Sequence, residues 1–186
     1  MKKEVSIAIS ARHVHLTKEV YEKLFDKELT IRNNLNQRGE FAANEVVSLS
    51  TEKNKIDNVR IIGPLRNYNQ VEISASDARK LGIKPPVRRS GDIANAEMIT
   101  ISTSKGKVTL PACIIAERHV HMTPKMAEEF GLKDKDIIKL KIDGIKSGTI
   151  DINVKVSNNA YFEVHLDTDD ANAFLLDNNS KGTLII

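Results

Sequence analysis

A four-residue sequence, Arg-His-Val-His, occurs twice in this 186-residue chain and restricts the structures that the chain can form. The copies are residues 12–15 and 118–121, and they contain four of the five histidines. Residues i and i+2 of a strand project from the same face, about 7 Å apart at roughly 3.3 Å per residue. On a helix the same pair would diverge, because helical metal-binding pairs use the spacing i and i+4. The duplication therefore predicts two strands, each presenting two imidazoles to a metal ion.

The sequence around both copies supports this interpretation. Residues 5–10 alternate between larger apolar and small side chains, which is the pattern of a half-buried strand. An apolar run rich in β-branched residues covers 108–116, just before the second copy. Each copy is followed by a threonine suited to cap a helix and by a short helical pattern, over 18–25 and 124–130. The chain thus repeats a strand, a His-x-His pair and a helix.

Short strands separated by closely spaced turn signals account for most of the remaining sequence, which is typical of barrels and sandwiches. Two more short helices are expected over 76–81, closed by Gly82, and over 168–176. No low-complexity stretch separates two halves of the chain. Strands are expected over residues 46–50, 59–62, 70–74, 98–102, 108–115, 137–142, 149–156 and 162–166.

Composition excludes several classes of protein. A net charge of +3 and an aromatic content of 4% argue against nucleic-acid binding. No apolar stretch approaches the about 18 residues that a membrane span needs, and no signal-peptide pattern follows Met1. The single cysteine, Cys113, excludes an internal disulfide and lies in an apolar run typical of the core. We therefore expect a cytoplasmic protein.

Basic residues are concentrated between Arg60 and Arg89, where seven lysines and arginines accompany two acidic residues. Such a local excess suits a phosphate or a nucleotide-like ligand. A solvated surface would give the same pattern, so this observation alone leaves both interpretations open.

Six side chains are candidate metal donors: the four duplicated histidines, His165 and Glu72. Glu72 lies between Val71 and Ile73 and is expected to face away from these apolar neighbours. A catalytic zinc has three protein ligands and an open position, so six donors are enough for two such sites. The alternatives are that Glu72 faces solvent and that His165 is a hydrogen-bonded structural residue.

Six motifs cover nearly the whole chain in a recognisable order. They are residues 10–16 (SARHVHL), 63–66 (GPLR), 70–74 (QVEIS), 85–92 (PPVRRSGD), 118–122 (RHVHM) and 165–169 (HLDTD). Together they resemble the PduL family of phosphate acyltransferases, the phosphate propanoyltransferases or phosphotransacylases of the propanediol-utilisation type.

The resemblance implies a mainly β protein with short α-helices, built as two small β-barrels capped by helices, with the active site between them. Residues 2–11 and 117–186 would form one barrel, and residues 12–116 the other. The resemblance also implies two divalent metal ions, usually zinc, and exchange of a short acyl group between coenzyme A and inorganic phosphate. Only four residues precede the first strand, so we expect a free cytoplasmic enzyme acting on acetyl- or propanoyl-coenzyme A rather than one packaged in a microcompartment. A homo-oligomer is compatible with the sequence.

By the family pattern, the metal ligands would be His13, His15, Glu72, His119, His121 and His165. Arg66 would be the catalytic residue that holds phosphate, and Ser10, Arg60 and Asn172 match positions near the coenzyme A site. Ser74 departs from the pattern, because some relatives carry a metal-binding cysteine there, and a hydroxyl is a poorer zinc ligand than a thiolate.

The expected mechanism is direct acyl transfer in a ternary complex, without a nucleophilic side chain. One alternative is a cupin-like metal enzyme, since His13-x-His15-x-x-x-Glu19 fits part of the cupin pattern, although Lys125 stands where a second Glu19 would be. The other alternative is a non-catalytic module that binds metal or nucleotide.

Overall fold

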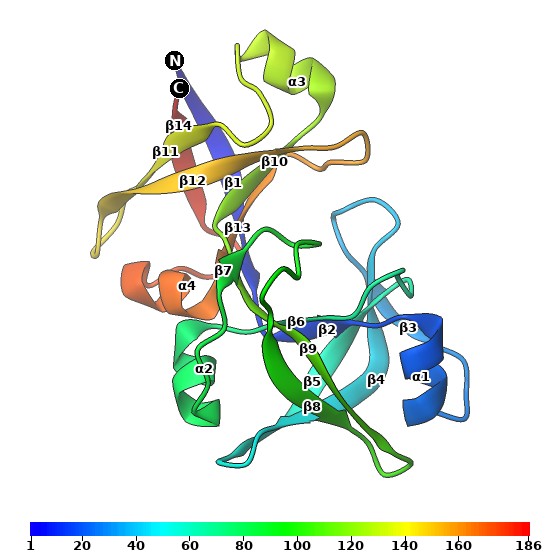
Figure 1. Ribbon diagram of the computed structural model, residues 1–186. Coiled ribbons are helices and arrows are strands. Elements are labelled where there is room, and N and C mark those ends of the chain that lie inside the picture. Colours follow the sequence, from blue (N-terminus) through cyan, green and yellow to red (C-terminus); the bar gives the residue numbers. More distant parts are fainter. The chain divides into compact units, whose positions relative to one another are not determined.

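The computed structural model describes residues 1–186, which form fourteen strands and four short helices (Figure 1). The chain divides into two compact units, one formed by Met1–Ala11 and Glu117–Ile186 and the other by Arg12–Ala116. The prediction of a mainly β protein with two barrels and short helices is confirmed. None of the four helices has the length and apolar character needed to cross a membrane.

The first unit is a closed six-stranded barrel with two short helices. Its elements are β1 (Lys2–Ser10), β10 (His119–Met122), α3 (Pro124–Glu129), β11 (Ile137–Ile142), β12 (Gly148–Val156), β13 (Glu163–Asp167), α4 (Thr168–Phe174) and β14 (Lys181–Ile185). The strand order around the barrel is β1, β13, β10, β12, β11, β14. Because β14 pairs antiparallel with β1, the two chain ends lie side by side (Figure 1). Side chains such as Ile7, Val120 and Leu140 fill the interior.

The second unit also contains a ring of six strands. Its elements are β2 (His13–His15), α1 (Lys18–Leu24), β3 (Ile31–Asn34), β4 (Phe41–Ser50), β5 (Lys55–Gly63), β6 (Gln70–Glu72), α2 (Ala75–Leu81), β7 (Val87–Arg88), β8 (Glu97–Ser102) and β9 (Lys107–Ala116). The order β4, β5, β2, β6, β9 closes into a ring because β8 pairs with both β4 and β9. β3 and β7 extend this sheet beyond the ring. Leu49, Ile61 and Ile114 are among its fully buried side chains.

All four helices begin at a residue whose side chain accepts a backbone N–H of the first turn, as expected of an N-cap. Thr17 and Thr123 cap α1 and α3, which confirms their predicted role. Ser74 and Asp167 cap α2 and α4. The last helix is shorter than predicted because Leu175 adopts a left-handed conformation with φ of 56°.

Three strands were not expected from the sequence. β3 has no alternation of burial, since all four of its residues are exposed. β7 has only two residues. β14 forms by pairing with β1 and β11, which are distant in sequence, so its local pattern carries little information about it. The predicted strands 46–50 and 59–62 are also longer in the structure, as β4 and β5.

Candidate metal and phosphate sites

The first His-x-His pair belongs to a compact donor set in the second unit. β2 and β6 run antiparallel, with His13 opposite Glu72 and His15 opposite Gln70. The Nε2 atoms of His13 and His15 lie 3.5 and 3.8 Å from Oε1 of Glu72. Glu72 is only 8% exposed, so the alternative of a solvent-facing carboxylate is wrong. Nδ1 of His15 lies 3.1 Å from the carbonyl of Ile62, and donation to that oxygen leaves Nε2 without a proton.

The electrostatics of this set suit metal binding. Burial, reinforced by the charges of His13 and Arg66, lowers the pKa of His15 to about 3, which keeps its imidazole neutral. Burial alone would raise the pKa of Glu72, but His13 and His15 outweigh this effect and lower it, so the carboxylate is ionised. A neutral His15 and an ionised Glu72 are the forms in which these two side chains would bind a metal ion.

Gln70 lies beside this set and was not among the residues predicted for it. Its Nε2 donates to Oε1 of Glu72 at 2.5 Å and to Oγ of Ser90 at 3.0 Å. Its Oε1 accepts the backbone N–H of Gly91 at 2.7 Å. The spacing could have indicated this position, because residues 70 and 72 of one strand share a face.

The second His-x-His pair forms a donor set of its own in the first unit. β10 and β13 run antiparallel, with His119 opposite His165 and His121 opposite Glu163. The Nε2 atoms of His119 and His121 are 3.1 Å apart, and the donor atoms of all three histidines lie within 4.8 Å of one another. Nδ1 of His119 lies 2.8 Å from the carbonyl of Glu117, so donation to it leaves Nε2 free of a proton.

In each set, one pair of donors is separated by about the distance expected between two ligands of a tetrahedral ion, and the remaining donors lie within 4.8 Å. Zinc–nitrogen bonds of about 2.0–2.1 Å place neighbouring ligand atoms about 3.3–3.4 Å apart at the tetrahedral angle. The separations of 3.1 Å for the His119–His121 pair and 3.5 Å for the His13–Glu72 pair are close to this length. Each set has three converging donors, which leaves a fourth position for a substrate atom. Both sets therefore fit a divalent ion such as zinc.

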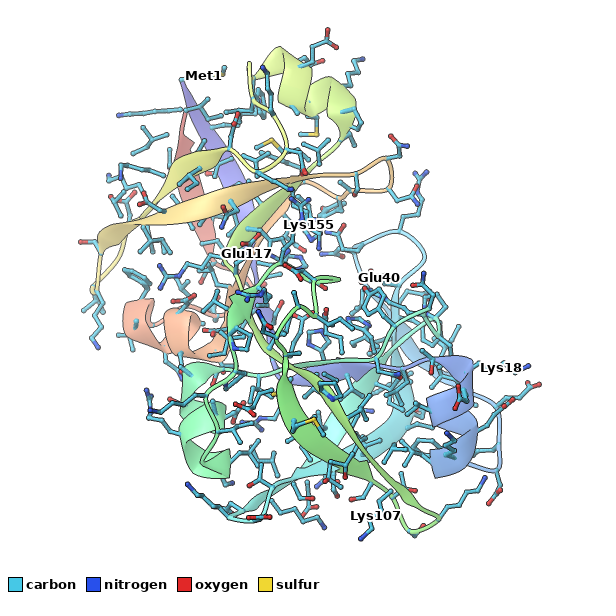
Figure 2. The ribbon with its side chains drawn as sticks, viewed as in Figure 1. Met1, Lys18, Glu40, Lys107, Glu117 and Lys155 are labelled. Atoms are coloured by element: carbon cyan, nitrogen blue, oxygen red, sulfur yellow. The ribbon has the colours of Figure 1, made fainter.

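Arg66 lies beside the set of the second unit. Its backbone N–H donates to the carbonyl of Leu16 at 2.8 Å, and its charge contributes to the lowered pKa of His15. The guanidinium donates to the hydroxyl of Tyr68 and, at 2.7 Å, to Oε1 of Glu40. Glu40, labelled in Figure 2, lies in the loop between β3 and β4. These contacts hold Arg66 in place, and 20% of its side chain remains exposed to solvent.

The three residues predicted near coenzyme A are distributed over the two units. Ser10 ends β1 and Asn172 is exposed on α4, both in the first unit. Arg60 lies on β5 in the second unit, where its Nη1 donates to the carbonyls of Ala43 at 2.6 Å and Asn44 at 3.3 Å. Their role in binding coenzyme A stays a prediction.

Ser74 and Cys113 have structural surroundings. The hydroxyl of Ser74 accepts the backbone N–H of Asp77 at 3.2 Å and is used as a helix cap. Cys113 is fully buried, and burial raises the pKa of its thiol to about 12, with Glu97 and Asp77 adding to the effect. The thiol therefore stays protonated at neutral pH, as expected of a core residue and not of a nucleophile.

Glu19 does not join the histidines, which removes the basis of the cupin-like alternative. It lies on the exposed face of α1, where its carboxylate accepts a hydrogen bond from Lys23 at 2.7 Å. The carboxylate that converges on His13 and His15 is Glu72 instead.

Comparison with known proteins agrees with this arrangement. Residues 6–177 match the family model described as phosphate propanoyltransferase. The chain is 45% identical over 174 residues to a phosphate propanoyltransferase of Lachnoclostridium phytofermentans, an alignment that covers 91% of this chain and 81% of that protein. Phosphate propanoyltransferases of Thermotoga maritima and Clostridioides difficile are 44% and 42% identical, with 92% and 99% of this chain and 84% and 90% of those proteins covered. The resemblance seen in the motifs is confirmed: the chain belongs to the phosphate propanoyltransferase family and is an acyltransferase.

Proposed function

We propose that this enzyme exchanges a short acyl group between coenzyme A and inorganic phosphate, and that each donor set binds one divalent ion, zinc, that serves this reaction. Family membership makes the chain a phosphate acyltransferase. The observation that supports the metal dependence is the convergence of three donors in each set within 4.8 Å, with one pair in each set at about the ligand separation of a tetrahedral ion.

The reaction transfers the acyl group between sulfur and oxygen. A phosphate oxygen forms a bond to the thioester carbonyl carbon, the carbon–sulfur bond breaks, and the sulfur leaves with the electron pair as the thiolate of coenzyme A. Phosphate and the developing carbonyl oxyanion are both negative, so they need positive charge. Divalent ions held by the two donor sets would supply this charge as Lewis acids.

Arg66 supplies positive charge from the chain itself. A guanidinium can give two parallel N–H donors to a phosphate, which fixes its orientation as well as its position. Glu40 and Tyr68 hold the guanidinium, so less side-chain freedom is lost when the anion binds. Arg66 is therefore the phosphate-binding catalytic residue of the proposal.

No covalent acyl-enzyme is part of this mechanism. Cys113 is the only thiol of the chain, and it is buried and protonated. The acyl group then passes directly from coenzyme A to phosphate while both are bound. We assign Ser10, Arg60 and Asn172 to coenzyme A on the same proposal. The similarity to phosphate propanoyltransferases supports a short acyl chain.

Thiol release tests the function. Purified protein is incubated with propanoyl- or acetyl-coenzyme A, with and without phosphate, and free coenzyme A is measured together with bound metal. We expect release that requires phosphate, two ions per chain, and initial-velocity patterns that intersect. Parallel velocity patterns would contradict direct transfer. A protein that binds metal but releases no thiol would instead support the non-catalytic binding module.

A further inference from the structure

Glu163 is a buried carboxylate beside the three histidines of the first unit. It lies opposite His121 on the neighbouring strand and two residues before His165 on its own strand, so its side chain shares their face. Its Oε2 is 3.2 Å from Nε2 of His165, and the residue is 6% exposed. Burying a carboxylate is unfavourable unless hydrogen bonds or charges compensate for lost water. The contact with His165 provides such compensation and links Glu163 to this donor set.

The geometry places Glu163 at the side of the set. The three donors that converge are those of His119, His121 and His165, and Glu163 approaches one of these rings at a nitrogen. A carboxylate that accepts the N–H of a metal-binding imidazole fixes the tautomer and orientation of the ring and makes its other nitrogen more basic.

We propose that Glu163 is a positioning residue for the metal set of the first unit. It accepts the Nε2–H of His165 and so leaves Nδ1 of that ring without a proton, as the atom that binds the ion. This inference rests on the proposed function, which gives this set a divalent ion.

The second unit supports the assignment independently. Gln70 lies opposite His15 as Glu163 lies opposite His121, so the two residues hold the same place in their strand pairs. Gln70 uses its amide N–H to donate to Glu72, the third ligand of its set. A carboxylate ligand needs a donor beside it and an imidazole ligand needs an acceptor. Gln70 thus provides a donor for Glu72 in the second unit, and Glu163 provides an acceptor for His165 in the first.

The test isolates the set of the first unit. In full-length protein carrying His13→Ala and Glu72→Ala, zinc affinity is measured by competition with a chromogenic chelator. In this background Glu163→Ala should weaken zinc binding by about 10- to 100-fold, the usual effect of losing such a partner. Glu163→Gln should lose less than Glu163→Ala, because the amide oxygen can still accept the Nε2–H. Glu4→Gln, on the exposed part of β1 in the same unit, is the matched control and should change nothing.

The outcomes separate the two proposals. Unchanged zinc affinity in both Glu163 variants would overturn the positioning role and leave the metal set intact. No zinc in the parent would overturn the metal set, and with it this inference. Because Glu163 is buried, melting of each variant is followed without metal, and Glu163→Gln carries the test if Glu163→Ala does not fold. The absorption spectrum of bound cobalt should change in the Glu163 variants and not in Glu4→Gln, since only the first alter a ligand ring.

Discussion

The donor sets of the two units share a backbone plan and differ in their third ligand. In each, a His-x-His strand runs antiparallel to a strand that provides the third ligand, and a helix cap follows two residues later. The third candidate ligand is Glu72 in the second unit and His165 in the first. A divalent ion would keep a formal charge of +2 among three neutral imidazoles and +1 beside the carboxylate. The two units thus repeat one scaffold, and ions bound to the two sets would differ in strength as Lewis acids.

The arginine of each Arg-His-Val-His copy makes the same contact in both units. Arg12 donates to Asp77 in the first turn of α2, and Arg118 donates to Asp170 in the first turn of α4. Both acidic residues follow the helix cap by three positions. The arginine therefore holds the helix that follows the third donor. This role explains why the repeated sequence includes an arginine in addition to the two histidines.

Dismantling either set should have the largest effect. His13→Ala and His119→Ala should each lower kcat/KM by about a thousandfold or more, because the ion's stabilisation of developing charge is worth several kcal/mol. Metal content should fall by one ion per chain in each variant, as measured on protein purified without chelator. Glu19→Ala, an exposed change on α1, should keep activity and both ions. Full activity in one histidine variant that has lost its ion would show that the two sets do not serve the same reaction.

Arg66 tests whether phosphate is handled from the second unit. Arg66→Lys keeps the charge and loses the two-pronged donor geometry, so KM for phosphate should rise by about 10- to 100-fold, equivalent to roughly 1.4–2.8 kcal/mol. KM for the coenzyme A thioester should stay the same, and steady-state kinetics with each substrate varied separates the two. Arg32→Lys, on the exposed strand β3, is the matched control. An equal rise in both KM values would contradict a phosphate-specific role.

The two arginine pairs should contribute modestly to stability and differ from one another. Arg118 holds Asp170 with two hydrogen bonds of 2.8 and 2.7 Å, whereas Arg12 holds Asp77 with one of 2.9 Å. Both arginine side chains are 43% exposed, so solvent weakens the pairs, and we expect coupling energies of about 1 and 0.5 kcal/mol, respectively. Double-mutant cycles on urea unfolding, with Arg→Ala and Asp→Ala changes, measure them. Equal couplings would mean that the second hydrogen bond adds nothing.

The strands of both His-x-His pairs could be predicted because local patterns determine them. Spacing placed each pair on a strand, and Thr17 and Thr123 marked the helices that follow. The burial of Glu163 could not be predicted in this way. Glu163 lies between Phe162 and Val164, an alternation that is also typical of a solvent-facing carboxylate. Its burial results from the pairing of β13 with β1 and β10, which depends on residues far away in sequence.

Cys113 gives the smallest expected effect and a sharp test of direct transfer. It lies on β9 opposite Val71, next to the strand that carries Glu72, so a thiol acyl carrier would make the second unit the acyl-binding half. Cys113→Ala should change kcat by less than about twofold, because the residue contributes packing only. Its pKa is raised to about 12, so alkylation of the native protein should stay slow from pH 7 to 9, while an ordinary thiol with a pKa of about 8.5 reacts increasingly over this range. One thiol per chain should react after unfolding in urea.

Mass spectrometry of enzyme quenched during turnover should find no acyl group on Cys113. A thioester there would contradict direct transfer and assign the acyl group to the second unit.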